Sequence, residues 1–167
     1  MKALRSCPLF AGMSEIEIDL TLGNVSHQLV SLPSHEVYAL AGMPCKYVDI
    51  VVTGRLVCRM AALSGKQVEV SRLHSGNMVA PAFIFSKDRS LPVSVETDGK
   101  VQLFRMRPEE LKRLIDVDDV IRMNFIRILS NIDVFLTQKM KILSLFTVRE
   151  KVAYLLMERA GEQGRSE

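Results

Sequence analysis

The residues best suited to catalysis or metal binding are few and widely separated in this chain of 167 residues. Its histidines are His27, His35 and His74, and its cysteines are Cys7, Cys45 and Cys58. A cupin-like metal oxygenase needs two or three histidines and a carboxylate on one ion, and no close H-x-H pair is present. The cysteine spacing argues against both a disulfide framework and a thiolate metal site. We therefore expect no enzyme, and the cupin-like oxygenase is the alternative that metal analysis would test.

The segment GNMVAPAFIFSKDRSLPVSV, residues 76–95, has the glycine-led form of a loop that approaches a ligand closely. Its first half holds no carboxylate, and its only cations, Lys87 and Arg89, follow the aromatic residues. Its prolines also remove backbone N–H donors that could hold an anion. The segment predicts an apolar effector pocket lined by Val79, Ala80, Pro81, Ala82, Phe83, Phe85, Leu91 and Pro92. Such a pocket suits a large, flat, hydrophobic ligand or no ligand at all.

The elements that must position this segment are short β-branched runs separated by glycines. The runs are 48–52, 56–60, 67–70, 93–95 and 101–106. Short strands with a turn every 8–12 residues are typical of a β-sandwich or barrel. Before them, Ser14 and Glu17 have the spacing of a capping box, which predicts a helix over 14–22.

The last third of the chain has a helical pattern. Pro108 followed by Glu109 and Glu110 predicts a helix start, because proline suits the first turn and acids suit the positive end of the helix dipole. Further on, apolar residues recur at alternating steps of four and three, the heptad pattern of a coiled coil. The predicted dimer seam consists of Ile121, Phe125, Ile128, Ile132, Phe135 and Ile142. A helix buried entirely within its own monomer is the alternative.

Composition is that of a folded soluble protein, with 48% hydrophobic and 25% charged residues. No run approaches the ~18 apolar residues of a membrane span. The basic start is followed by an apolar stretch that is too short for a secretory signal. We expect a cytoplasmic protein without a membrane partner.

The order of these features resembles that of the Crp/Fnr regulators over nearly the whole chain. CPLFAGMSEIEIDLTL is similar to their opening helix, and SGNMVAPAFIF falls where they carry the phosphate-binding cassette. PEELKRLIDVDD is similar to the small helix before their dimer helix, and LSLFTVREKVAYLLMERA to the helix that opens their DNA-binding domain. The resemblance implies an α+β, mainly β fold, with a jelly-roll (double-stranded β-helix) sensor domain over 1–117. A dimerisation helix over 118–145 would follow, and 146–167 would start a DNA-binding domain whose helix-turn-helix is absent from this chain.

The cassette departs from that of the cyclic-AMP-binding members, which carry Gly-Glu for the ribose and Arg-Ser for the cyclic phosphate. Aligned on Gly76, these positions hold Ala80-Pro81 and Leu91-Pro92. A buried phosphate requires a fixed cation with paired donors, so we expect no cyclic nucleotide. A cAMP-binding module with a shifted arginine, Arg89, is the alternative. The family's iron–sulfur site needs several N-terminal cysteines, and Cys7 stands alone near the start, so we expect no iron–sulfur cluster.

The cassette VAPAF with a following PV also resembles that of the HcpR-type nitrosative-stress regulators, for which haem and nitric oxide have been proposed. That resemblance implies a haem cofactor and a gas effector. Imidazole and thioether groups both bind haem iron. The candidate ligands are His74, Met60, Met78, Met123 and Met140.

We therefore expect the ligand-sensing and dimerisation domain of a Crp/Fnr-type transcription regulator. A small-molecule or gas effector in the β domain would alter packing against the helix over 118–145 and so reposition the attached DNA-reading domains. The expected partners are a second copy of the chain and, only through a C-terminal domain not in this chain, DNA. A dimerising scaffold without a ligand is the alternative.

Overall fold

The computed structural model describes residues 2–61, 64–145, 147–150, 152–153 and 156–157. The chain divides into two compact units, residues 1–129 and residues 130–167. The expected start of a DNA-binding domain over 146–167 falls mostly outside the described residues. Within the described part of the chain, every helix is too short or too polar to span a lipid bilayer.

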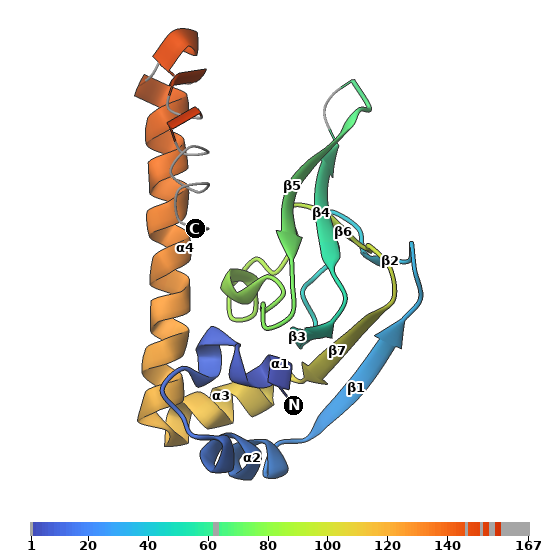
Figure 1. The fold of residues 1–167 in the computed structure, drawn as a ribbon, viewed down its shortest axis with the longest axis vertical. Helices are drawn as coiled ribbons and strands as arrows, with labels where there is room; N and C mark the ends of the chain where they lie inside the picture. The colour runs from blue at the N-terminus through green and yellow to red at the C-terminus, as the bar shows by residue number, and fades with distance from the viewer. Residues whose placement is uncertain (1, 62–63, 146, 151, 154–155, 158–167) are drawn as a thin grey trace. The chain divides into compact units, whose positions relative to one another are not determined.

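Along the chain, helical elements precede and follow seven strands, and one short helical element lies between the fifth and sixth strands (Figure 1). The helical elements are α1 (Lys2–Arg5), η1 (Pro8–Phe10), α2 (Glu15–Gly23), η2 (Pro81–Phe83), α3 (Pro108–Val117) and α4 (Asp119–Leu145). The strands are β1 (His27–Leu32), β2 (Val37–Ala39), β3 (Val48–Thr53), β4 (Leu56–Ala61), β5 (Gln67–Leu73), β6 (Ser94–Thr97) and β7 (Val101–Met106). The fold is mainly β with a long helix after the strands, which confirms the predicted class.

Two antiparallel sheets form the β part. The first has the order β1-β7-β3, and the second has the order β2-β6-β4-β5. Strand β7 therefore pairs with β1 on one side and with β3 on the other, and Asp49 of β3 stands directly opposite Arg105 of β7. Residues that are distant in sequence therefore become neighbours through their pairing with β7.

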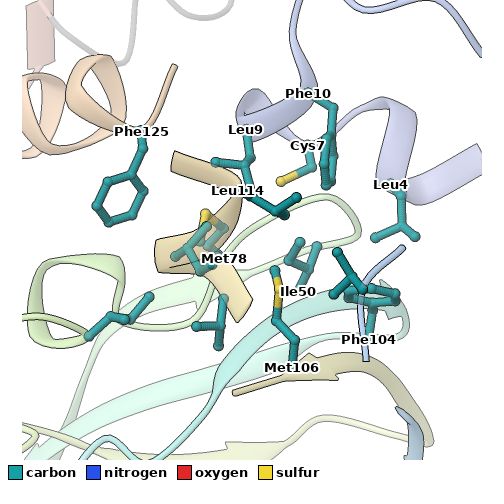
Figure 2. Close-up of a cluster of buried hydrophobic side chains, with 14 of the residues drawn as sticks. Leu4, Cys7, Leu9, Phe10, Ile50, Met78, Phe104, Met106, Leu114 and Phe125 are labelled. Atoms are coloured by element: carbon teal, nitrogen blue, oxygen red, sulfur yellow. The ribbon is translucent and has the colours of Figure 1, made fainter. Parts of the chain in front are cut away.

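Alternation along β7 separates two hydrophobic cores. Phe104 and Met106 belong to a cluster that also contains side chains of the N-terminal helices, of α3 and of the start of α4 (Figure 2). Val101 and Leu103 belong to a second cluster, which includes residues of β3, β4 and β6. Because successive side chains of a strand point to opposite faces, one strand contributes to both cores.

The local signals for helix starts are confirmed. The backbone N–H of Ser14 donates to the Glu17 carboxylate at 2.7 Å, and Glu17 N–H donates to Ser14 Oγ at 3.4 Å, so the capping box is complete. Helix α3 begins with Pro108 and carries Glu109 and Glu110 in its first turn. Both starts follow from residues within four positions of each other, which is why the sequence pattern was sufficient.

The predicted dimer seam requires a correction at its first two positions. Ile121 is fully buried and Phe125 is 5% exposed, both in the core of the first unit. Asn124 fixes the same part of α4, because its amide donates to the carbonyl oxygens of Leu9 and Ala11 at 3.1 and 2.8 Å. The start of the heptad pattern is therefore covered by this chain itself.

The remaining seam positions differ in exposure. Ile128 packs against the core of the first unit. Ile132 and Ile142 are half-buried, and Phe135 is 55% exposed. The seam prediction is thus confined to the residues from Ile128 onward.

Candidate functional site

The segment 76–95, which we call the cassette, begins with a stretch that is hydrogen-bonded to β3. Gly76 N–H donates to the Val51 carbonyl at 2.8 Å, and Val79 N–H donates to the Asp49 carbonyl at 2.8 Å. Met78 forms a bridge with Ile50. These bonds place Val79 directly beside the buried part of β3.

A close contact with another part of the chain explains why position 76 is a glycine, and the sequence did not reveal this contact. Its φ is +88°, and an added Cβ would lie 2.5 Å from Ser6 Oγ and 3.2 Å from the Ser6 carbonyl carbon. Only glycine fits such a close approach at positive φ. The close neighbour is therefore the N-terminal segment of the chain itself, where the sequence pattern indicated a ligand.

A left-handed turn follows at Ala80, which has a φ of 46°. Glycine adopts this conformation without strain, whereas an L-residue with a Cβ incurs about 1–2 kcal/mol. After the turn, Phe83 N–H donates to the Ala80 carbonyl and Ile84 N–H donates to the Pro81 carbonyl. Two of the N–H groups that follow the turn are thus already used within the chain, and Pro81 has none to offer.

The eight predicted pocket residues differ in burial. Val79 and Leu91 are buried, Ala80, Pro81 and Phe83 are half-buried, and Ala82, Phe85 and Pro92 are exposed. Phe85 lies edge-on to Phe125 of α4, with ring centroids 5.7 Å apart. The pocket around the whole segment stays a prediction, and two of its eight residues, Val79 and Leu91, line the cavity described next.

Val79 and Leu91 line a pocket of about 150 Å³, which we call the cassette pocket. Its other lining residues are Tyr38, Ala39, Met43, Pro44, Cys45, Lys46, Tyr47 and Arg105. Most of them come from β2 and the loop before β3, which the sequence analysis did not connect with the cassette.

Backbone hydrogen bonds join that loop to the second part of the cassette. Leu91 N–H donates to the Met43 carbonyl at 2.9 Å, and Gly42 N–H donates to the Leu91 carbonyl at 2.8 Å. Cys45 N–H donates to the Arg89 carbonyl at 2.9 Å, and the Arg89 side chain is exposed. The pairing fixes Leu91, which is 4% exposed, as the inward residue of this stretch.

A group of three polar side chains, the buried Asp49 with the half-buried Tyr38 and Arg105, adjoins the cassette pocket; we call it the charge network. Asp49 is fully buried, and Arg105 donates to both of its carboxylate oxygens, from Nε at 2.8 Å and from Nη2 at 2.7 Å. The Tyr38 hydroxyl donates to Asp49 Oδ2 at 2.6 Å. Arg105 also stacks over the ring of Tyr47, 4.4 Å from its centroid. Sequence reasoning missed this group because its members lie 11 and 56 positions apart.

Electrostatics in the charge network follows from burial and from the fixed ion pair. Burial raises the pKa of the Tyr38 phenol well above its usual range, and the neighbouring Asp49 carboxylate adds to this effect. The hydrogen bond to Asp49 raises the pKa of Arg105. Tyr38 is therefore a neutral donor, and the positive charge of Arg105 is matched by Asp49.

The three thiols are buried and free. Burial raises the pKa of Cys7 to about 11, and burial also raises the pKa of Cys45 and of Cys58. Each of these thiols is thus protonated at neutral pH, and thiolate is the form that attacks and binds metals. Among the described residues, no three His, Cys, Asp or Glu side chains gather as metal ligands would.

The candidate haem ligands are dispersed over different elements. Met78 is buried in the core, whereas Met60, His74, Met123 and Met140 are exposed. The cassette pocket is lined by none of the five, and its 150 Å³ is below the 300–1,000 Å³ of most small-molecule pockets. The five candidates therefore do not converge on the cassette pocket.

Comparison with known proteins defines the class. The family model described as "Cyclic nucleotide-binding domain" matches residues 29–118, more than half of the chain. The chain therefore belongs to the cyclic nucleotide-binding domain family. A search of curated proteins finds no match to the sequence.

Similar solved structures include transcription regulators, as the sequence resemblance predicted, and also the regulatory domain of PKA from Toxoplasma gondii. The catabolite activator protein of Thermus thermophilus has a TM-score of 0.72 at 19% identity, covering 82% of this chain and 63% of that protein. The sensor domain of the regulator DNR from Pseudomonas aeruginosa has a TM-score of 0.66 at 18% identity, covering 88% and 93%. A transcriptional regulator from Thermotoga maritima has a TM-score of 0.68 at 20% identity, covering 71% and 92%. At these identities the likeness shows the shared fold.

The ligand that gives the family its name does not fit the residues present. The place expected to hold the phosphate-binding arginine is filled by the buried Leu91, and the two oxygens of Asp49 already occupy Arg105. The exposed Arg89 side chain is not a buried cation. A cyclic phosphate in this pocket would therefore lose its hydration without gaining a matched cation.

Proposed function

We propose that this chain is the effector-sensing and dimerisation part of a Crp/Fnr-type transcription regulator whose effector is not a cyclic nucleotide. The observation that supports the proposal is the buried Leu91, in a chain of the cyclic nucleotide-binding domain family, at the position where the sequence resemblance implies a phosphate-binding arginine. The cassette pocket is the proposed effector site. Its size favours a small ligand. The neutral Tyr38 and the ion-paired Arg105 offer polar contacts, whereas an anion would need a cation without a carboxylate partner.

A route from the cassette to the long helix supports a sensing role. Phe85 of the cassette contacts Phe125 of α4, and α4 continues without interruption to Leu145. An effector that binds one arrangement of the cassette more tightly than another would change the packing of Phe85 on this helix. We propose that α4 carries the change to a dimer interface, and that DNA is read by a domain outside this chain.

The second half of α4 supports dimerisation through exposed apolar side chains. Val134, Phe135, Leu136 and Met140 are each more than half exposed in the single chain. Large exposed apolar side chains gathered on one stretch of a helix are common at an interface with a second protein surface. Light scattering should give a dimer mass, and Phe135→Glu should give a monomer.

Calorimetry with cyclic nucleotides tests the effector proposal. We expect no heat of binding for cAMP or cGMP at concentrations up to the millimolar range. A thermal-shift screen of small neutral ligands should then find compounds whose stabilisation is lost in Leu91→Phe, which fills the cassette pocket. Tight uptake of cAMP would contradict the proposal and favour the alternative of a shifted Arg89. A screen without any stabilising ligand would favour the ligand-free scaffold.

Haem-based sensing of nitric oxide is a finer proposal that rests on the sequence resemblance. Its test is a spectrum of the purified chain with hemin, before and after nitric oxide. A Soret shift that disappears in Met78→Leu or His74→Ala would assign a ligand. A shift that survives substitution of all five candidates, or no shift, would remove the specific-ligand idea.

A further inference from the structure

A second pocket, of about 280 Å³, lies between the N-terminal helices and the first sheet. We call it the helix–sheet pocket. Its walls come from α1 and α2 on one side and from β1, β3 and β7 on the other, all within the first unit. It shares no lining residue with the cassette pocket. Whatever binds here is therefore independent of the proposed effector site.

The apolar wall of this pocket is an incompletely covered part of the sheet. Elsewhere on the same face, Ile50 and Met106 are sealed beneath the helices. In the pocket, Leu29 of β1 is 61% exposed and Val52 of β3 is half-buried, beside the buried Leu22 of α2. A ligand that covers Leu29 and Val52 would gain hydrophobic free energy in proportion to the apolar area removed from water.

The polar side chains at the pocket are the Asp19 carboxylate, the His27 ring and the Gln102 amide. His27 Nδ1 lies 2.9 Å from the Val25 carbonyl oxygen, which can only accept, so Nδ1 carries the proton. In the neutral ring, Nε2 is then an acceptor. The ring is stacked on Phe104 with centroids 4.6 Å apart, which fixes its orientation.

The charge of the pocket has one sign. Asp19 of α2 contributes a carboxylate, and the described residues that line the pocket include neither lysine nor arginine. A carboxylate beside an apolar wall favours a cation that carries an apolar body. An apolar anion of the same size would be repelled.

We propose that the helix–sheet pocket binds a small apolar amine. Its alkyl or aryl body would cover Leu22, Leu29 and Val52, and its ammonium group would donate to the Asp19 carboxylate and to His27 Nε2. The volume is close to the lower end of small-molecule pockets, which limits the ligand to a compact molecule.

Methyl NMR of the full chain with 2-phenylethylamine tests this proposal. With leucine and valine methyl groups labelled, we expect saturable shifts at Leu22, Leu29 and Val52 at pH 7.5. The anion 3-phenylpropionate has a similar size and the opposite charge, and we expect it to bind at least about tenfold more weakly. Shifts that centre on Val79 and Leu91 instead would overturn the proposal.

Two variants separate the charge from the apolar wall. Asp19→Asn removes the carboxylate from an exposed position and should weaken the amine by about fivefold, while the neutral analogue 2-phenylethanol keeps its affinity. Asp116→Asn on α3, which removes a carboxylate paired with Lys112 outside the pocket, is the matched control and should change neither ligand.

The second variant is Leu29→Lys, at a side chain that is already mostly exposed. Its stem can cover the wall and its ammonium group adds a like charge at the pocket, so the variant should fold and lose the amine. Equal affinity of the wild type and Asp19→Asn for the amine would overturn the proposal, as would the absence of saturable shifts.

Discussion

The cassette wall and the charge network lie at one pocket but differ in chemistry. Val79 and Leu91 present only apolar atoms, whereas Asp49, Arg105 and Tyr38 form a bidentate ion pair with an added hydroxyl donor. The half-buried Arg105 is bound to the protein's own carboxylate. An arginine beside a pocket in a nucleotide-binding fold is therefore no sign of anion binding until its existing partners are known.

Within the cassette, the backbone conformation and the side chains also point to different conclusions. Ala80 has the left-handed φ that suits a glycine. The resemblance implies a glycine at this position in the cyclic-AMP-binding members of the family. At the positions where the resemblance implies groups for the ribose and the phosphate, this chain has Pro81 and Leu91. The shape of the cassette thus depends on its hydrogen bonds to β3, and its ligand preference depends on a few side chains.

Removal of the cation from the charge network should have the largest effect. Arg105→Met leaves the Asp49 carboxylate buried without its partner, and we expect a loss of about 3–5 kcal/mol in the free energy of unfolding. Urea denaturation measures this loss. The double variant Asp49→Leu/Arg105→Met removes both charges and should recover most of the stability. A loss below about 1 kcal/mol in the single variant would show that the pair is solvated.

The cassette wall should respond to loss of volume. Leu91→Ala removes a buried side chain from a position that is fixed by two backbone hydrogen bonds, and we expect a loss of about 2–5 kcal/mol. Pro92→Gln, at the exposed neighbour, is the control and should remain within about 0.5 kcal/mol. Similar losses at the two positions would contradict the inward placement of Leu91.

The strained turn offers a gain of stability. Ala80→Gly relieves a Cβ at positive φ, and we expect an increase of about 1 kcal/mol in the free energy of unfolding. Ala82→Gly, inside the short helix η2 that follows, should lower stability by about 0.5–1 kcal/mol. Thermal unfolding of the pair distinguishes backbone strain from a general effect of glycine.

The smallest effect should come from the partly exposed edge of the network. Tyr47 is 40% exposed and contributes its ring face to Arg105. Tyr47→Leu keeps apolar volume and removes this contact, so we expect a loss of about 0.5–1 kcal/mol. If the loss equalled that of Arg105→Met, the ring and not the carboxylate would be the main partner of the cation.

Short-range patterns gave correct expectations for several elements. The capping box at Ser14, the proline start at Pro108 and the strand runs between glycines depend on neighbours within a few residues. The heptad pattern on α4 correctly indicated an apolar helix. It could not tell which side of that helix is covered by the chain itself, so Ile121 and Phe125 were placed in an interface and lie in the core.

The sequence by itself determined the mainly β class, the long helix and the apolar character of the cassette, because residue type and local spacing settle these. Tertiary structure decided the partner of each buried group. Asp49 meets Arg105 only because β3 and β7 pair in one register, and Leu91 faces inward only because it pairs with the loop at Met43. Strand register joins residues that no local pattern relates, and a shift by one position would turn each side chain to the other face.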